Sequence, residues 1–70
     1  MANATFLING NQAAIINQDD DKVWVNIYVN VRGAKNAKEA ALIGDITGLR
    51  WKGRRIKSAE KWAKNVLQII

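Results

Sequence analysis

The clearest pattern in the chain is a ten-residue stretch in which apolar and polar side chains alternate. In residues 23–32 (VWVNIYVNVR) the odd positions are valine or isoleucine, and the even positions carry aromatic, amide or guanidinium groups. Successive side chains of a strand point to opposite faces of a sheet, so this alternation predicts a strand with one dry face. The other face of that strand would present the polar and aromatic groups.

Two shorter apolar segments precede this strand and predict a hairpin. Residues 4–8 (ATFLI) and 12–17 (QAAIIN) flank Asn9-Gly10, and Asn-Gly is the strongest two-residue hairpin signal because both positions tolerate positive φ. A polar loop at residues 18–22 (QDDDK) follows, and aspartates favour turns because their side chains bond nearby backbone groups. We therefore expect three consecutive antiparallel strands.

Helical spacing of apolar residues indicates two helices in the second half of the chain. Residues 35–43 predict a helix with Asn36 as its N-cap and Gly44 as its stop. Residues 59–69 predict a second helix with Ser58 as its N-cap. Between them, residues 46–57 predict a strand or a short hairpin.

These elements predict one α+β domain spanning residues 1–70. In the order β-β-β-α-β-α, a three- to four-stranded antiparallel sheet would carry two helices packed on one face. Small side chains on the first helix would let it lie close to the valine face of residues 23–31. The alternative is a separate C-terminal helical lobe.

The residue types argue against catalysis. The chain has no histidine and no cysteine, which removes the commonest general base, the commonest metal ligands and any disulfide. It also lacks a Gly-rich phosphate loop and a nucleophile motif. The triplet Asp19, Asp20 and Asp21 is interpreted as a solvated turn, because three consecutive residues seldom converge on one cation. We expect a protein that is not an enzyme and has no cofactor or metal.

The distribution of apolar and basic residues also shows no targeting signal. No apolar run approaches the roughly 20 residues of a membrane-spanning helix. Residues 1–9 lack the basic start and long apolar stretch of a secretory signal. Since cysteine is absent too, we expect a cytoplasmic protein without a membrane partner.

The positive charge is concentrated in the second half of the chain. Residues 1–31 carry one lysine and three aspartates, a net charge of −2, whereas residues 32–70 carry ten basic and three acidic side chains, a net charge of +7. Polyanions are common partners of such one-sided charge. We predict that phosphates bind a basic cluster, with a merely solvated face as the alternative. The cluster consists of Arg50, Lys52, Arg54, Arg55, Lys57, Lys61 and Lys64.

The polar face of the alternating strand predicts a second surface. Trp24 and Tyr28 lie four residues apart on one side of the strand, with Arg32 beyond them, and Trp51 lies among basic residues. If exposed, such aromatics suit base stacking or a protein interface. If a helix covers this face, the aromatics are core residues.

Two functions therefore remain open. The leading one is binding to a nucleic acid, or docking on a nucleoprotein, through the basic cluster. The alternative is a protein–protein interaction module that uses Trp24, Tyr28, Arg32 and Trp51, either as a homodimer or as an inhibitor of another protein. In size and composition the chain is similar to the short accessory proteins of phages and plasmids, many of which inhibit a host complex.

Overall fold

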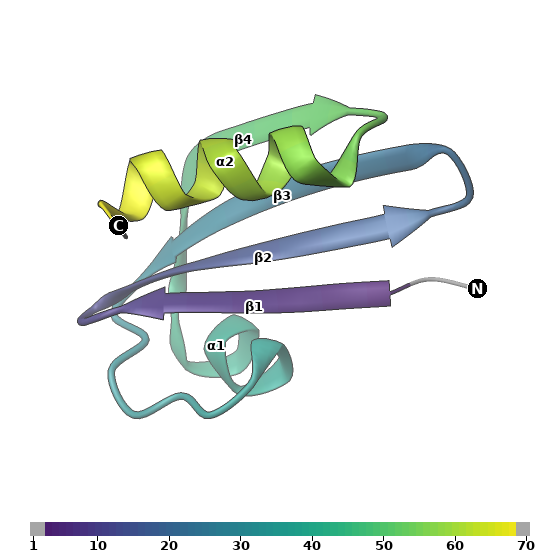
Figure 1. Cartoon of the computed structure of the whole chain (residues 1–70). Helices are drawn as coiled ribbons and strands as arrows, with labels where there is room; N and C mark the ends of the chain where they lie inside the picture. Colours follow the sequence, from purple (N-terminus) through teal and green to yellow (C-terminus); the bar gives the residue numbers. More distant parts are fainter. Residues whose placement is uncertain (1–2, 69–70) are drawn as a thin grey trace.

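The sheet of this protein has four antiparallel strands in chain order, and a helix lies on each side of it (Figure 1). The computed structural model describes residues 3–68. The α+β class and the order β-β-β-α-β-α are as predicted. The elements are β1 (Asn3–Asn9), β2 (Gln12–Asp19), β3 (Lys22–Val29), α1 (Ala37–Ile43), β4 (Asp45–Gly53) and α2 (Ile56–Leu67).

Two tight turns connect the first three strands. Asn9 still pairs with Gln12, so the residues of the first turn are Gly10 and Asn11, and Gly10 has a φ of +63°. The second turn passes through Asp20, which has a φ of +54°. Glycine adopts this left-handed backbone without strain, and aspartate tolerates it better than most residues. The predicted hairpin and the polar turn are therefore present, but the first turn is formed by Gly10-Asn11 and not by the predicted Asn9-Gly10.

β3 ends three residues earlier than the alternation predicted. Asn30 has a left-handed φ of +60° and leaves the strand. Its side-chain amide donates to the carboxylate of Asp45 at 2.8 Å and accepts from Asn11 at 3.2 Å, so it joins the first turn to the start of β4. Val31 consequently turns to the other side of the sheet and packs near α1.

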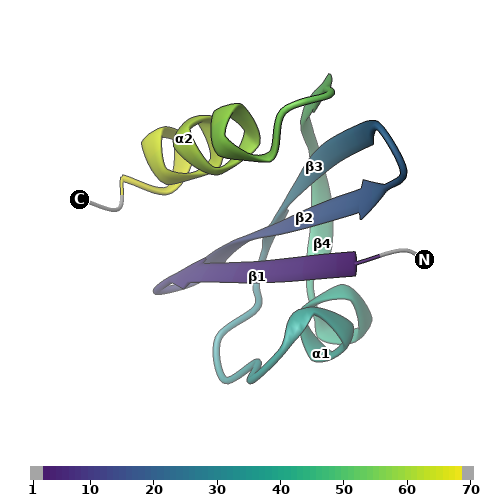
Figure 2. The same cartoon turned by 45° about the vertical axis from the view of Figure 1, so that its right-hand side comes forward.

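The two helices cover opposite faces of the sheet, which corrects the prediction that both pack on one face (Figures 1 and 2). We call the side under α2 the α2 face and the side under α1 the α1 face. The α2 face holds the larger core, in which Ala14, Ile16, Val23, Val25 and Ile27 pack against Ala59, Ala63 and Leu67. The α1 face holds a smaller core, in which Phe6, Ala13, Ile15 and Tyr28 pack with Val31, Ala34, Ala37 and Ala40.

The sequence of β2 explains why a helix packs on each face of the sheet. Four consecutive residues of this strand, Ala13, Ala14, Ile15 and Ile16, are buried. Neighbouring side chains of a strand point to opposite faces, so both faces of β2 need protection from water. The valine face of β3 accordingly belongs to α2, and the small residues of α1 pack on the other side.

The residues that cap α1 at its two ends are the ones that the sequence predicted. The side chain of Asn36 accepts a hydrogen bond from the backbone N–H of Glu39 at 2.9 Å, which confirms Asn36 as the N-cap. The carboxylate of Glu39 accepts in turn from the backbone N–H of Lys35 at 2.9 Å. Gly44 ends the helix, as predicted, and a Cβ at this position would lie 2.7 Å from the carbonyl oxygen of Ala40.

α2 begins earlier than the sequence predicted. Its N-cap is Arg55, which makes no side-chain capping bond, and Ser58 lies inside the first turn. Ile56 packs against the α2-face core, and this burial favours a helix that starts at that residue. At the other end, the side-chain amide of Asn9 donates to the carbonyl of Leu67 and fixes the helix end to β1. The predicted residue 69 lies outside the described residues.

Candidate nucleic-acid interface

The candidate site is built on β3 and β4, and their register decides which side chains meet. Trp24 lies opposite Lys52, and Asn26 lies opposite Arg50. Directly opposed residues of antiparallel strands share a face, with Cβ atoms roughly 4.5–5.5 Å apart. All four side chains therefore lie on the α1 face. β4 is at the edge of the sheet, so its cations border solvent.

A bulge in β4 ends this regular pairing. Tyr28 pairs with Ile46, so two steps along β3 from Asn26 correspond to four steps along β4 from Arg50. The hydroxyl of Thr47 fills the gap by donating to the carbonyl of Ile27 at 3.0 Å and accepting from the N–H of Leu49 at 3.1 Å. The bulge thus separates the basic half of β4 from its apolar first half.

Trp51 points away from its basic neighbours. It pairs with Val25 and packs against the α2-face core. Gly53 makes room for its ring, because a Cβ at Gly53 would lie 2.8 Å from Cζ2 of Trp51. Trp51 is therefore half-buried and contributes to the α2-face core. Trp62 of α2 is also half-buried against that cluster.

A hollow of about 430 Å³ lies between β3 and β4. We call it the Trp24 hollow; Trp24, Val25, Asn26, Arg50, Trp51 and Lys52 line it. A second hollow of about 410 Å³ shares Trp24 and Lys52 and extends to Asp21, Lys22 and Arg54. The Trp24 hollow combines an aromatic ring, an amide and two cations, and none of its lining residues is acidic.

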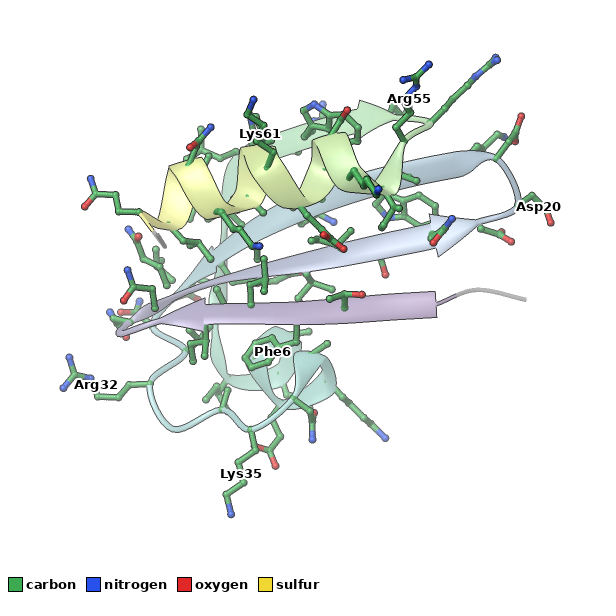
Figure 3. The ribbon with its side chains drawn as sticks, viewed as in Figure 1. Phe6, Asp20, Arg32, Lys35, Arg55 and Lys61 are labelled. Atoms are coloured by element: carbon green, nitrogen blue, oxygen red, sulfur yellow. The ribbon has the colours of Figure 1, made fainter. Side chains whose placement is uncertain are left out.

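The other residues of the predicted aromatic surface do not join Trp24. Tyr28 is half-buried in the α1-face core. Arg32 is exposed in the segment between β3 and α1, and Figure 3 shows it at the opposite end of the molecule from Arg55. Trp24 is half-buried as well, but it is the aromatic of that set that belongs to neither core cluster, and it lines the Trp24 hollow.

Every residue of the predicted basic cluster is exposed, but the cluster does not lie on one face of the protein. Arg50 and Lys52 project from the sheet on the α1 face, whereas α2 covers the opposite face. Figure 3 shows Arg55 and Lys61 pointing away from the sheet on the outer side of α2. Arg54 and Arg55 lie in the connection from β4 to α2 and join the two surfaces. Lys57, Lys61 and Lys64 complete the part on α2.

The three aspartates lie at the turn between β2 and β3, where Asp19, Asp20 and Asp21 are exposed. Within residues 3–68, no group of three or more carboxylate side chains is arranged to hold a metal ion. This acidic turn borders the second hollow through Asp21, where Lys22, Lys52 and Arg54 outweigh its charge.

An exposed apolar segment was not anticipated from the sequence. Leu42 is 75% exposed and Ile43 53% at the end of α1, while Ile46 is 62% exposed and Leu49 54% in β4. The signal available was a short apolar run, LIGDITGL, which matched neither a complete helix stripe nor a regular strand. Across the described part of the chain, neither helix is long and apolar enough to cross a membrane.

Comparison of this chain with protein-family models, with curated proteins and with solved structures finds no match. The protein is a small α+β domain in which Trp24 lies beside the exposed cations Arg50 and Lys52 at one edge of the sheet. A second basic surface lies on the outer side of its C-terminal helix.

Proposed function

We propose that this protein is a non-enzymatic nucleic-acid-binding protein, whose exposed cations bind phosphates of the free polymer or of a nucleoprotein. The observation that carries this proposal is that exposed cations form two basic surfaces, one on β4 and one on α2, which Arg54 and Arg55 connect. Its expected location is the cytoplasm. Single surface charges contribute little to stability, so a run of them is better explained by a ligand than by the fold.

The charges on α2 are arranged to follow an extended polyanion. Lys57, Lys61 and Lys64 are spaced four and three residues apart, so they share one helix face. Glu60 is the one acidic residue among the 12 residues of this helix, so the helix stays net positive. Each cation that neutralises a phosphate releases condensed counterions, which makes the affinity strongly dependent on salt.

We expect the protein to bind DNA at low salt and to lose that binding steeply as salt is added. Each phosphate contact contributes about −0.9 to the slope of log affinity against log salt concentration for a duplex, and about −0.7 for a single strand. Fluorescence anisotropy of labelled DNA across a salt series measures this slope. A parent protein without measurable affinity for either DNA form at low salt would refute the proposed function.

A second candidate function is protein binding, and the exposed apolar segment at residues 42–49 favours it. Leu42 and Ile46 are more than half exposed, and clustered exposed apolar residues often mark protein interfaces. We propose a homodimer as the form this interaction takes, because self-association is a common route to stability for chains this short. The alternative is that this segment binds a different protein.

For the homodimer, we expect sedimentation at roughly tens of micromolar to show a species of twice the 7.8 kDa chain mass. The double variant Leu42→Asp, Ile46→Asp should return the protein to the monomer mass, because it places charge in the apolar segment. Sedimentation of the parent as a monomer throughout this range would rule the homodimer out.

A further inference from the structure

Building on the proposed function, we infer that the ligand is a single-stranded nucleic acid and that one of its bases stacks on Trp24 in the Trp24 hollow. Arg50 and Lys52 would hold the phosphates on either side of that base. The inference rests on nucleic-acid binding as such, and it adds the form of the polymer and the residue that recognises it.

The first support is the geometry of β3 and β4. Lys52 lies directly opposite Trp24, and Arg50 lies two residues further along the same strand. Alternate residues of a strand are about 6.8 Å apart, so the two cations can contact different points of one backbone. Asn26, which lies directly opposite Arg50 and also lines the hollow, offers an amide that can donate to and accept from a base edge.

The second support is the size of the hollow. Its volume of about 430 Å³ is at the small end of the roughly 300–1,000 Å³ of small-molecule sites, so it has room for a base but not for a duplex. Duplex recognition instead uses a helix or ribbon inserted into a groove. Stacking on an aromatic side chain needs an unpaired base, and all four bases offer a π face.

The third support is the way the surroundings restrict the site to one base. Tyr28 is packed under α1 and Trp51 is packed under α2, so neither ring continues the stacking platform. Beyond Lys52, the second hollow places Lys22 and Arg54 beside Asp21 and stays net positive. The strand can therefore continue from Lys52 toward Arg54 and the basic surface of α2.

The test compares the parent with Trp24→Leu, which keeps an apolar side chain but removes the stacking ring, and with Trp24→Phe, which keeps a ring but removes the indole emission. The probes are an oligothymidylate about 15 nucleotides long, near the upper site size of small single-strand-binding folds, and a duplex of equal length. Trp62→Phe is the matched control, because Trp62 lies on α2 and packs against the α2-face core.

We expect oligothymidylate to quench tryptophan fluorescence in the parent and in Trp62→Phe but not in Trp24→Phe. The affinity of Trp24→Phe should stay within about threefold of the parent, whereas that of Trp24→Leu should fall about 5- to 150-fold, as for the loss of one stacked base. Duplex binding should be weaker than single-strand binding in the parent and unchanged in Trp24→Leu.

The inference is overturned if Trp24→Leu binds oligothymidylate as tightly as the parent, or if Trp24→Phe keeps the quenching. Should Trp24→Leu fail to fold, the quenching in Trp24→Phe decides alone. If the parent binds both polymers and only the charge-reversal variant described in the Discussion loses that binding, this inference fails and the proposed function is kept. If the parent binds neither polymer, both fail.

Discussion

Replacing Ile27 by alanine is expected to destabilise the fold by about 2–5 kcal/mol. Ile27 is 1% exposed and lies in the α2-face core. The change leaves a cavity between β3 and α2 that neighbouring side chains can fill only in part. A chain of this length has a marginal core, so the loss is a large fraction of a total of roughly 5–15 kcal/mol. Thermal denaturation followed by circular dichroism measures it, with an expected decrease in Tm of at least about 8 °C.

Ile8→Ala is the matched control for this experiment. It deletes the same atoms from an exposed residue that lies outside the apolar segment at residues 42–49, and surface changes usually alter stability by less than about 0.5 kcal/mol. If Ile27→Ala instead melts within a degree or two of the parent, Ile27 is not a core residue and the packing of α2 on this face is wrong.

Reversing Arg54, Arg55 and Lys57 to glutamate is expected to reduce the affinity for nucleic acid by orders of magnitude. The change removes three attractions and adds three repulsions where the two basic surfaces join, and it should flatten the salt slope by roughly three. The fold should survive, because all three side chains are exposed and Arg55 makes no side-chain capping bond. Acidic side chains at the start of α2 also interact favourably with the helix dipole. Anisotropy titrations at two salt concentrations provide the measurement.

The control for the charge reversal is a variant with the same net charge and a different location. Arg32, Lys35 and Lys38 are exposed residues in and before α1, and Figure 3 shows Arg32 and Lys35 on the opposite side of the molecule from α2. Reversing these three to glutamate should weaken binding far less. Equal losses in the two variants would mean that net charge alone governs binding, and an unchanged affinity in the first would reject the basic cluster as the site.

Local signals in the sequence were sufficient to predict most elements. β3 follows from the alternation of valine and isoleucine, and α1 follows from Asn36 and Gly44, whose capping roles the structure confirms. These features depend only on residues close together in the chain. The start of α2 was wrong because Ser58 is a good N-cap by residue type, whereas the burial of Ile56, a tertiary effect, determines where the helix begins.

The placement of the helices required information that the pattern did not contain. In β2, Ala13 to Ile16 are apolar at every position, so the period of two that assigns a face is absent. Only the paired structure shows that Ala13 and Ile15 face α1 while Ala14 and Ile16 face α2. A strand that is apolar on both sides indicates a sheet with packed elements on both of its faces.

The candidate site was predicted only as separate pieces. Trp24 and the basic cluster were both named from the sequence, but their meeting depends on the register of β3 and β4. That register changes by two residues at the bulge, where Gly48 has a φ of +89°. A glycine inside a strand can mark a bulge, but it does not give the size of the register change. The same register separates Arg50 and Lys52 from the lysines of α2, although all of them appear as one run in the sequence.

The chain-order arrangement of the sheet has a consequence for how quickly the protein acquires its structure. Each strand pairs with the one before it. The first two connections are tight turns, whereas β3 and β4 are joined through α1 and pair residues that lie 16 to 30 positions apart. Hairpins joined by tight turns form in about 1–10 μs, and pairing across longer loops is slower. The contact of Asn9 with Leu67 spans 58 residues and closes a still longer loop. We therefore expect the first three strands to pair before β4 and α2 pack against them.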